Sequence, residues 1–459
     1  MSLSASYYSY GDLVSTLCGH VRVYTYSDDH MAWAQLGEDL DGDFRNPIQS
    51  GWSVALSGDG KVVAVGAGGD ESGTLEDEPE YVRVNYWDGM KWGRRGTDIY
   101  GQSPSGYFGS STALSRDGDT LAAGAWAGDA PYVQVYTWNS TNWNQQGGDI
   151  YGDGGADHFG WSVSLSSDGT MLAIGAPIAN VGHWRNETKA GRVRVYSWDG
   201  ADWNKRGDAI DGEHEQDESG ISVSLSGDGN ILSIGAPQNK DNGANSGHVR
   251  VYHWKDNRWA IRGIDIDGGA LFDYSGRSVS LSSDGNMVAI GAPNHSGDGR
   301  WKGRVRIYGW NTSAWTQIGG DILGESLFDQ SGYSVSLSSN GSLVSIGAML
   351  NDGNGLSSGH TRVYFLSDDN AWVQLGTDID GERGFDQSGR SVSLSSDGKT
   401  LAIGASQNDC EYSPPPPYPP APPPPTQPPS PSPPPPPSPP PPPSPPPPPS
   451  PPPPPSPPP

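Results

Sequence analysis

The clearest pattern along the chain is a short stretch in which serine alternates with valine or leucine, as in Gly276–Gly285 (GRSVSLSSDG). Side chains of a β-strand point to alternate faces, so this pattern predicts a strand with Val and Leu on one face and Ser on the other. The Asp-Gly that follows predicts a tight hairpin, because glycine accepts the positive φ of such turns. The stretch returns seven times, at Gly51, Gly109, Gly160, Gly220, Gly276, Gly332 and Gly389.

Three more apolar stretches follow each copy. In the repeat that begins at Gly276 they are Met287–Pro293 (MVAIGAP), Gly303–Tyr308 (GRVRIY) and Trp315–Ile322. Each repeat is therefore expected to form four short antiparallel strands and no helix. A lone sheet of this size cannot bury its apolar face, so neighbouring sheets must stack around an axis. The sequence thus predicts an all-β fold, a seven-bladed β-propeller.

Pairs of tryptophans, five residues apart, recur near the end of the repeat. Aromatic rings of this size contribute large packing surfaces. We expect them to pack between neighbouring sheets. The pairs are Trp87/Trp92, Trp138/Trp143, Trp198/Trp203, Trp254/Trp259 and Trp310/Trp315.

The two ends of the repeat region complement each other. Gly19–Tyr24 (GHVRVY) and Trp33–Leu40 match third and fourth strands, whereas Ser391–Ala405 supplies a first and a second. We expect a propeller over residues 1–412 whose last blade combines residues 1–42 with 389–412. In the alternative, Met1–Thr16 opens a blade of its own and Ser391–Ala405 is free to join another subunit.

The chain has two cysteines, Cys18 and Cys410, and both fall where the expected composite blade has a break between its second and third strands. A disulfide there would close the ring, and it would require an oxidising compartment. By the chain-entropy argument it would stabilise the fold by roughly 4–5 kcal/mol. Two buried free thiols are the alternative.

Five Asn-x-Ser/Thr sequons fall in expected turns or loops, where a glycan can be carried. These N-glycosylation candidates are Asn139, Asn186, Asn294, Asn311 and Asn340.

The net charge of −25 belongs to the repeat region. It argues against nucleic acid or an anionic membrane surface as a partner. Carboxylates recur between blades, for example at Asp321, Asp329, Asp378 and Asp386, and are expected mainly to cap turns. No EF-hand-like loop occurs. We therefore expect no metal site and no cofactor.

Phe159-Gly160, Gly175-Ala176-Pro177 and Val193–Tyr196 resemble the FG-GAP repeat of integrin-α-type propellers. The resemblance covers about residues 19–405 and implies seven blades. Calcium-binding members carry an acidic loop between the first and second strands. Here that position is a tight turn, as at Ser396-Asp397-Gly398, so calcium binding of that type is not implied.

Residues 413–459 are proline-rich and settle into a Ser-Pro-Pro-Pro-Pro-Pro repeat. Proline fixes φ and lacks an amide donor, so a polyproline II rod is expected. The segment resembles the Ser-Pro repeats of extensins and pherophorin-like glycoproteins of plants and green algae. That resemblance implies hydroxylated prolines and O-glycosylation. The regular positions are Ser432, Pro433, Pro434, Pro435, Pro436, Pro437, Ser438, Ser444, Ser450 and Ser456.

The chain lacks the common catalytic motifs, which favours a protein that is not an enzyme. It has no apolar run long enough to span a membrane and no visible signal peptide. Because the other features favour secretion, we expect a mature or incomplete form. The predicted function is a secreted structural glycoprotein that self-associates into an extracellular fibre, cell wall or surface appendage, with other matrix glycoproteins as further partners. The alternative is a lectin-like or adhesive head on a glycosylated stalk.

Overall fold

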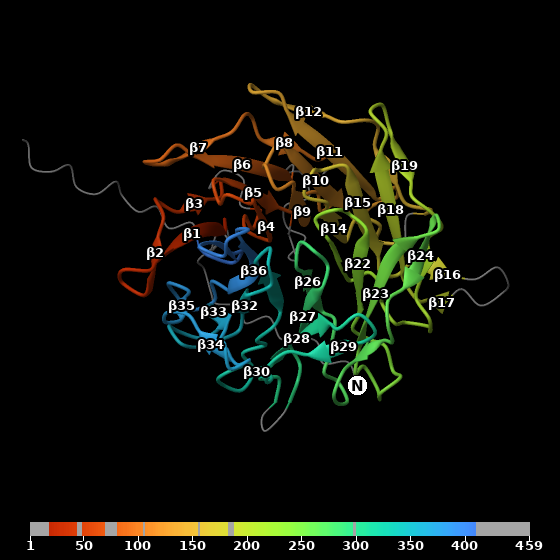
Figure 1. Cartoon of the computed structure of the whole chain (residues 1–459). Coiled ribbons are helices and arrows are strands. Elements are labelled where there is room, and N and C mark those ends of the chain that lie inside the picture. Colours follow the sequence, from red (N-terminus) through yellow and green to blue (C-terminus); the bar gives the residue numbers. More distant parts are fainter. Residues whose placement is uncertain are drawn as a thin grey trace, which may run out of the picture. The chain divides into compact units, whose positions relative to one another are not determined.

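The computed structural model describes residues 18–43, 48–68, 80–103, 106–154, 157–181, 188–296 and 300–409. Within these ranges all regular structure is β-strand. Seven twisted five-stranded sheets are arranged around a central axis, and one two-stranded hairpin accompanies them (Figure 1). The all-β, seven-bladed fold is therefore confirmed. The chain divides into two units, Met1–Cys410 and Glu411–Pro459. The second unit, with the predicted polyproline rod, lies outside the described residues. No helix among the described residues is long and apolar enough to cross a membrane.

Blade 5 shows the common plan. The inner strand β26 (Ser278–Leu281) pairs with β27 (Met287–Ala292), which pairs with β28 (Arg304–Trp310). Both β29 (Trp315–Gln317) and β30 (Ile322–Leu323) then pair with β28. The expected single fourth strand is thus two short strands, because a glycine with positive φ, Gly319, interrupts it.

The other blades repeat this order. Blade 1 has β4 (Ser53–Leu56), β5 (Val62–Ala67), β6 (Tyr81–Trp87), β7 (Trp92–Arg94) and β8 (Ile99–Tyr100). Blade 2 has β9 (Ser111–Leu114), β10 (Thr120–Ala125), β11 (Tyr132–Trp138), β12 (Trp143–Gln145) and β13 (Ile150–Tyr151). Blade 3 has β14 (Ser162–Leu165), β15 (Met171–Ala176), β18 (Arg192–Trp198), β19 (Trp203–Lys205) and β20 (Ile210–Asp211), with a small hairpin of β16 (Asn180–Val181) and β17 (Thr188–Lys189). Blade 4 has β21 (Ser222–Leu225), β22 (Ile231–Ala236), β23 (His248–Lys255), β24 (Arg258–Ile261) and β25 (Ile266–Asp267). Blade 6 has β31 (Ser334–Leu337), β32 (Leu343–Ala348), β33 (His360–Leu366), β34 (Trp372–Gln374) and β35 (Ile379–Asp380).

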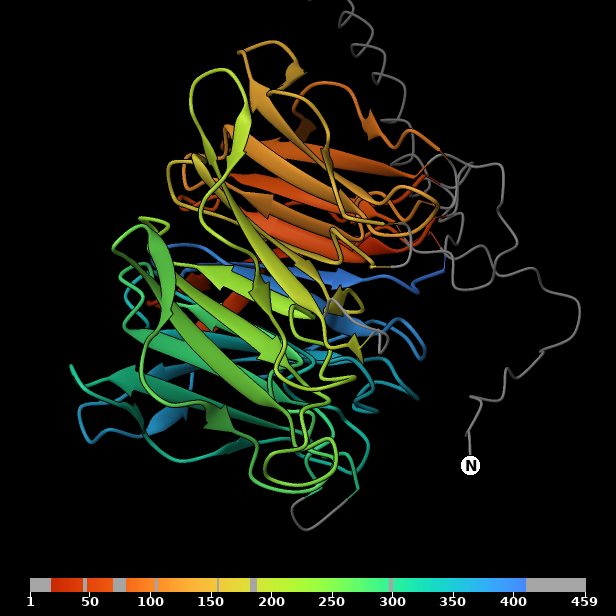
Figure 2. The ribbon, with the colours of Figure 1, turned by 90° about the vertical axis from the view of Figure 1, so that its right-hand side faces the viewer.

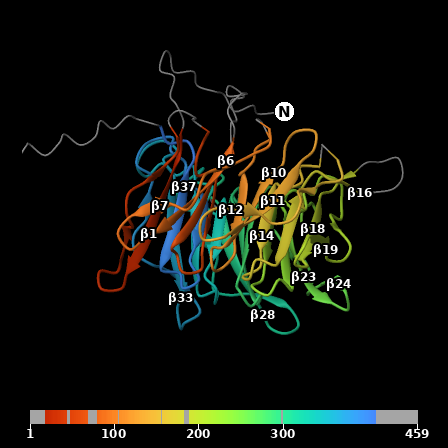
Figure 3. The ribbon, with the colours of Figure 1, turned by 90° about the horizontal axis from the view of Figure 1, so that it is seen from above.

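Blade 7 joins the two ends of the propeller. It contains β36 (Ser388–Leu394), β37 (Thr400–Ala405), β1 (His20–Ser27), β2 (Ala32–Gln35) and β3 (Leu40–Asp41). β1 pairs with β37 from His20↔Ala405 to Thr25↔Thr400 (Figure 3). The ring therefore closes within one chain, and the alternative in which Ser391–Ala405 is surplus is wrong. Residues 1–17 lie outside the described residues.

The apolar cores lie between neighbouring blades. One cluster combines Val305 and Ile307 of blade 5 with Leu337, Val344 and Ile346 of blade 6. Each fully buried side chain of this kind stabilises the fold by about 1.5–3 kcal/mol relative to exposure. The alternating Val and Leu of the inner strands thus hold blade to blade, as their spacing predicts.

The strands run between two faces of the propeller (Figure 2). The Asp-Gly hairpins and the Trp hairpins lie on one face, which we call the hairpin face. The connections after the second strand and after the outer strands lie on the other, which we call the loop face. These placements follow from the antiparallel pairing of every blade.

Candidate functional site

The inner strands surround a central channel, and their first serine links each blade to the next. In blade 5, for example, Ser278 Oγ donates to the carbonyl oxygen of Gly332 at 2.9 Å. The same bond occurs at every blade boundary, including Ser391 to Gly51 between blade 7, which joins the two chain ends and which we call the seam, and blade 1. The other donors are Ser53, Ser111, Ser162, Ser222 and Ser334. The channel wall is therefore fixed around its whole circumference.

The channel is narrow at the hairpin face. There, one residue of each blade donates its backbone N–H to the carbonyl oxygen of the equivalent residue in the next blade. Seven such bonds form a closed ring. The cavity at this end is about 150 Å³. The residues are Gly58, Arg116, Ser167, Gly227, Ser283, Ser339 and Ser396.

At the loop face the channel widens into a cavity of about 380 Å³, which we call the funnel. Its mouth is lined by the residue that follows each repeat glycine. This position varies although the residues on either side of it are nearly constant. Its occupants are Trp52, Ser110, Trp161, Ile221, Arg277, Tyr333 and Arg390.

Two arginines and two aromatic rings form one side of the funnel. Arg390 lies over the Trp52 ring, 3.5 Å from its centroid, and 5.8 Å from that of Tyr333. Arg277 lies 4.4 Å from the Tyr333 centroid and donates to the Tyr333 hydroxyl at 2.7 Å. Because an arginine keeps its charge and stacks on aromatic faces, this side offers two oriented guanidinium groups.

The opposite side is a cluster of aromatic rings. Trp126, which also lines the funnel, lies 4.8 Å from Trp161 and 4.6 Å from Tyr107, measured between ring centroids. His158 lies 4.6 Å from Trp126. Burial, with a smaller effect of Lys189, lowers the pKa of His158 and favours its neutral form. One funnel therefore combines apolar ring faces with fixed cations.

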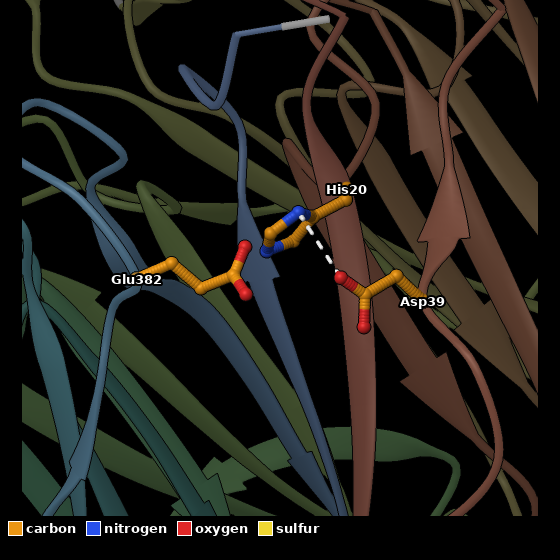
Figure 4. Close-up of side chains that lie close together, drawn as sticks. All are labelled: His20, Asp39 and Glu382. Carbon is orange, nitrogen blue, oxygen red and sulfur yellow. Dashed lines mark ion pairs between the residues drawn. The ribbon is translucent and has the colours of Figure 1, made fainter. Parts of the chain in front are cut away.

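A second kind of site lies at the loop face, where β1, β23 and β33 begin. His20 of β1 lies beside Asp39 of its own blade and Glu382, which precedes β36 (Figure 4). His248 and His360 begin β23 and β33 in the same way, each with two carboxylates. Within each group the candidate ligand atoms lie within 4.8 Å of one another.

Neither site was predicted from the sequence, although each has a sequence feature that could have indicated it. The funnel residues stand at the single variable position of the motif Gly-x-Ser. The histidine sites pair residues from different repeats, so they are visible only when the repeats are aligned with one another. The prediction that the chain has no metal site rested on the recurring aspartates, which were expected to cap turns, and on the lack of an EF-hand-like loop. Of these aspartates, Asp329 and Asp386 do cap their turns by accepting backbone N–H bonds.

The structure describes some of the predicted disulfide and glycosylation residues. Cys18 is buried and takes part in a disulfide, while Cys410 lies outside the described residues, so the predicted pair stays a prediction. Asn139, Asn311 and Asn340 lie exposed on the hairpin face, and Asn294 is half-buried on the loop face. Asn186 and the tail positions from Ser432 to Ser456 lie outside the described residues.

The tryptophans pack between sheets as predicted: Trp203 of blade 3 belongs to the same apolar cluster as Val133 of blade 2, and Trp198 packs against that cluster. The rings of Trp198 and Trp203 also pack against each other, with centroids 5.5 Å apart. The second tryptophan also donates its indole N–H to the preceding blade. Trp203 Nε1 donates to the Gln146 carbonyl at 3.0 Å. The same bond recurs from Trp33, Trp92, Trp143, Trp259, Trp315 and Trp372.

Comparison with known proteins gives the fold. No protein-family profile and no curated protein sequence matches the chain. A periplasmic gluconolactonase of Pseudomonas aeruginosa matches with a TM-score of 0.52 and 13% identity, over 80% of this chain and 96% of that chain. Hydrazine synthase of Kuenenia stuttgartiensis gives 0.51 and 14%, over 77% and 92%. A proposed 6-phosphogluconolactonase of Bacteroides uniformis gives 0.50 and 11%, over 79% and 96%.

These neighbours correct the prediction that the chain is not an enzyme. That prediction relied on the lack of familiar catalytic motifs. The same fold is found in a gluconolactonase, so the lack of those motifs is no ground for denying an activity. At such low identity the likeness establishes the fold alone.

Proposed function

We propose that the protein is an extracellular binding protein whose propeller head takes anionic saccharides in the funnel. One observation carries this proposal: the variable position that follows each repeat glycine places Trp52, Trp161 and Tyr333 in the same cavity as Arg277 and Arg390. Aromatic faces pack against the apolar C–H faces of sugar rings, and guanidinium groups bind carboxylate or sulfate through paired hydrogen bonds.

The charge of the whole molecule makes this local arrangement more significant. The chain carries a net charge of −25, yet two arginines lie together in the funnel. Long-range attraction cannot bring an anion to such a protein, so recognition must come from direct contacts. A hexuronate or a sulfated hexose combines the required ring face and anion.

The proposal that this head is extracellular and carried on a stalk is supported by the sequence. We assign the propeller to the FG-GAP type on its Phe159-Gly160 and Gly-Ala-Pro motifs, and residues 413–459 to a hydroxyproline-rich glycosylated stalk. The sequons and the disulfide of Cys18 support secretion into an oxidising compartment.

Binding to purified sugars tests the proposal. Isothermal titration of the full chain with an oligogalacturonate should give saturable binding, with little or no heat from the matched neutral oligogalactose. Arg277→Gln with Arg390→Gln should weaken binding at least tenfold. Arg258→Gln is the control, because Arg258 is exposed on β24, outside the funnel. Equal binding of both sugars, or equal loss in the control, would refute an anion-specific funnel.

A structural subunit of a fibre or wall is the second candidate. The connections into blades 5, 6 and 7 each expose a phenylalanine on the loop face: Phe272, Phe328 and Phe385. Leu271 and Leu327 are exposed beside the first two. Repeated apolar tips on one face favour contact with a second copy. Replacing all three phenylalanines with serine should reduce the sedimenting mass of the assembled protein. An unchanged mass would remove this candidate.

A further inference from the structure

In three blades, a histidine at the start of the third strand coincides with a glutamate in the connection from the preceding blade. Blades 4, 6 and 7 have histidine at the start of the third strand: His248, His360 and His20. In each case the connection from the preceding blade carries a glutamate directly after its first glycine: Glu213, Glu325 and Glu382. The other four connections have Asp43, Gln102, Asp153 and Gly269 there, and their blades begin the strand with Tyr81, Tyr132, Arg192 and Arg304.

The arginine blades show what this position requires. Arg304 donates to Asp273 at 2.7 Å and to Asp321 at 3.3 Å. Arg192 pairs with Asp153 at 2.9 Å and with Asp211 at 2.6 Å. In these blades a guanidinium group thus lies between carboxylates of its own blade and of the preceding connection. With the second arginine of the strand, Arg306 or Arg194, two guanidinium groups face two carboxylates, so the charge is balanced.

The histidine blades keep the carboxylates and lose that cation. His360 Nδ1 lies 3.7 Å from Asp378 and 4.0 Å from Asp380, and Glu325 completes the group. Arg362 pairs with Glu325 at 3.2 Å. Three carboxylates thus face one guanidinium, an excess of two negative charges. His248 is placed alike among Glu213, Asp241 and Asp265, with Arg250 on Glu213.

Two of the three imidazoles, those of His248 and His360, have ring nitrogens without hydrogen-bond partners. His248 is 0% exposed, and neither of its ring nitrogens has a hydrogen-bond partner. His360 is 1% exposed, and its Nε2 has none. A buried polar atom without a partner destabilises the fold, so two such side chains at equivalent positions point to a ligand. The nitrogen-to-carboxylate distances of 3.7–4.0 Å are too long for hydrogen bonds.

We propose that the three groups are inter-blade sites for a divalent transition-metal ion, with Zn²⁺ as the best fit. One imidazole nitrogen and two carboxylate oxygens match zinc ligation, whereas calcium and magnesium take oxygen ligands alone. With Zn–N and Zn–O bonds of about 2.0–2.2 Å, tetrahedral ligands lie about 3.4 Å apart, so the side chains need only close slightly. In the His248 and His360 groups a dipositive ion cancels the excess charge. Each ion would join two blades at the loop face.

The test uses the full chain, stripped with EDTA and dialysed against Zn²⁺, with bound metal counted by mass spectrometry. We expect three zinc ions per chain and a higher Tm with zinc than without. His248→Arg should fold, because Arg192 and Arg304 occupy the same position in other blades, and should bind two. The combined His20→Arg, His248→Arg and His360→Arg variant should bind none and show no Tm response. His253→Ala, on β23 but outside the group, is the control and should bind three.

A second measurement identifies the ligands. Co²⁺ in place of zinc should give visible d–d absorption bands that fall by a third in His248→Arg. Less than half an equivalent of zinc on the unsubstituted chain would overturn the proposal. So would three ions retained by the triple variant, or Ca²⁺ that displaces Co²⁺ at equal concentration.

Discussion

Trp33 Nε1 donates a hydrogen bond to the carbonyl oxygen of Leu375 at 2.9 Å, although the two residues are 342 positions apart. This bond joins blade 7 to blade 6, and six others like it join the remaining neighbours. The tryptophan belongs to an outer strand, and its acceptor precedes the glycine that interrupts the outer strand of the preceding blade. The interruption of the outer strand in one blade and the tryptophan of the next blade therefore form one inter-blade contact.

Replacing Trp33 with phenylalanine removes the donor and keeps an aromatic ring. We expect the free energy of unfolding to fall by about 1 kcal/mol, or somewhat more from the smaller ring. Trp203→Phe, at the same position in blade 3, should cost a similar amount in the same urea titration. A Trp33 variant with no effect beside a costly Trp203 variant would mean that the seam is open in solution.

Gly404 lies at a close approach between blades 7 and 1. A Cβ atom there would stand 2.2 Å from the carbonyl oxygen of Gly51. Gly404→Ala must therefore push the inner strand of blade 1 away, and we expect a loss of about 3 kcal/mol or more. Gly93→Ala is the matched control, because a Cβ there meets nothing within 4 Å. It should leave the Tm nearly unchanged, and equal shifts for both variants would contradict the close approach.

Asp321 is expected to make the stability of the fold depend on pH in the acidic range. Burial alone would raise its pKa, but hydrogen bonds from Arg306 and Gln317 outweigh burial and lower the pKa to about 2. A carboxyl with a depressed folded pKa stabilises the protein above the unfolded value near 3.8 and loses that contribution as pH falls towards 2. Because the group is partly exposed, we expect about 1 kcal/mol after solvent screening.

Asp321→Asn should therefore reduce stability at pH 6 and flatten the decline between pH 4 and 2. Chemical unfolding at a series of pH values measures both. Asp208→Asn, in the corresponding connection of blade 3 but exposed, should keep the decline. A decline of equal slope in Asp321→Asn would show that the Arg306 pair does not stabilise the fold.

The disulfide of Cys18 is expected to close the seam with Cys410. Peptide mapping without reductant should recover the two cysteines in one linked peptide. Cys18→Ser should lower stability by roughly 4 kcal/mol, since the bond closes nearly the whole propeller. A linked peptide between two chains would instead make the bond intermolecular.

The sequence predicts the repeating part of this structure well. Strand alternation, Asp-Gly turns and the spare strands Gly19–Tyr24 and Ser391–Ala405 are local signals, and they lead directly to seven blades and a composite seam. The interrupted outer strand was missed because Gly319 reads as an ordinary turn glycine, and its partner Trp372 belongs to the next repeat.

The candidate sites could not be read in the same way. A funnel residue such as Arg277 lies 56 positions from its partner Tyr333, and alternation says only that both positions face the axis. The pairing of His360 with Glu325 likewise requires knowledge that one blade packs beside the next. Such sites follow from the ring, not from any single repeat.

The most direct test of the account is a structure of the full chain in complex with an oligogalacturonate. We predict sugar density in the funnel, with a carboxylate between Arg277 and Arg390 and a sugar ring against Trp52 or Trp161. Density confined to the outer loops, or a funnel that stays free of sugar at saturating concentration, would contradict the proposed binding function.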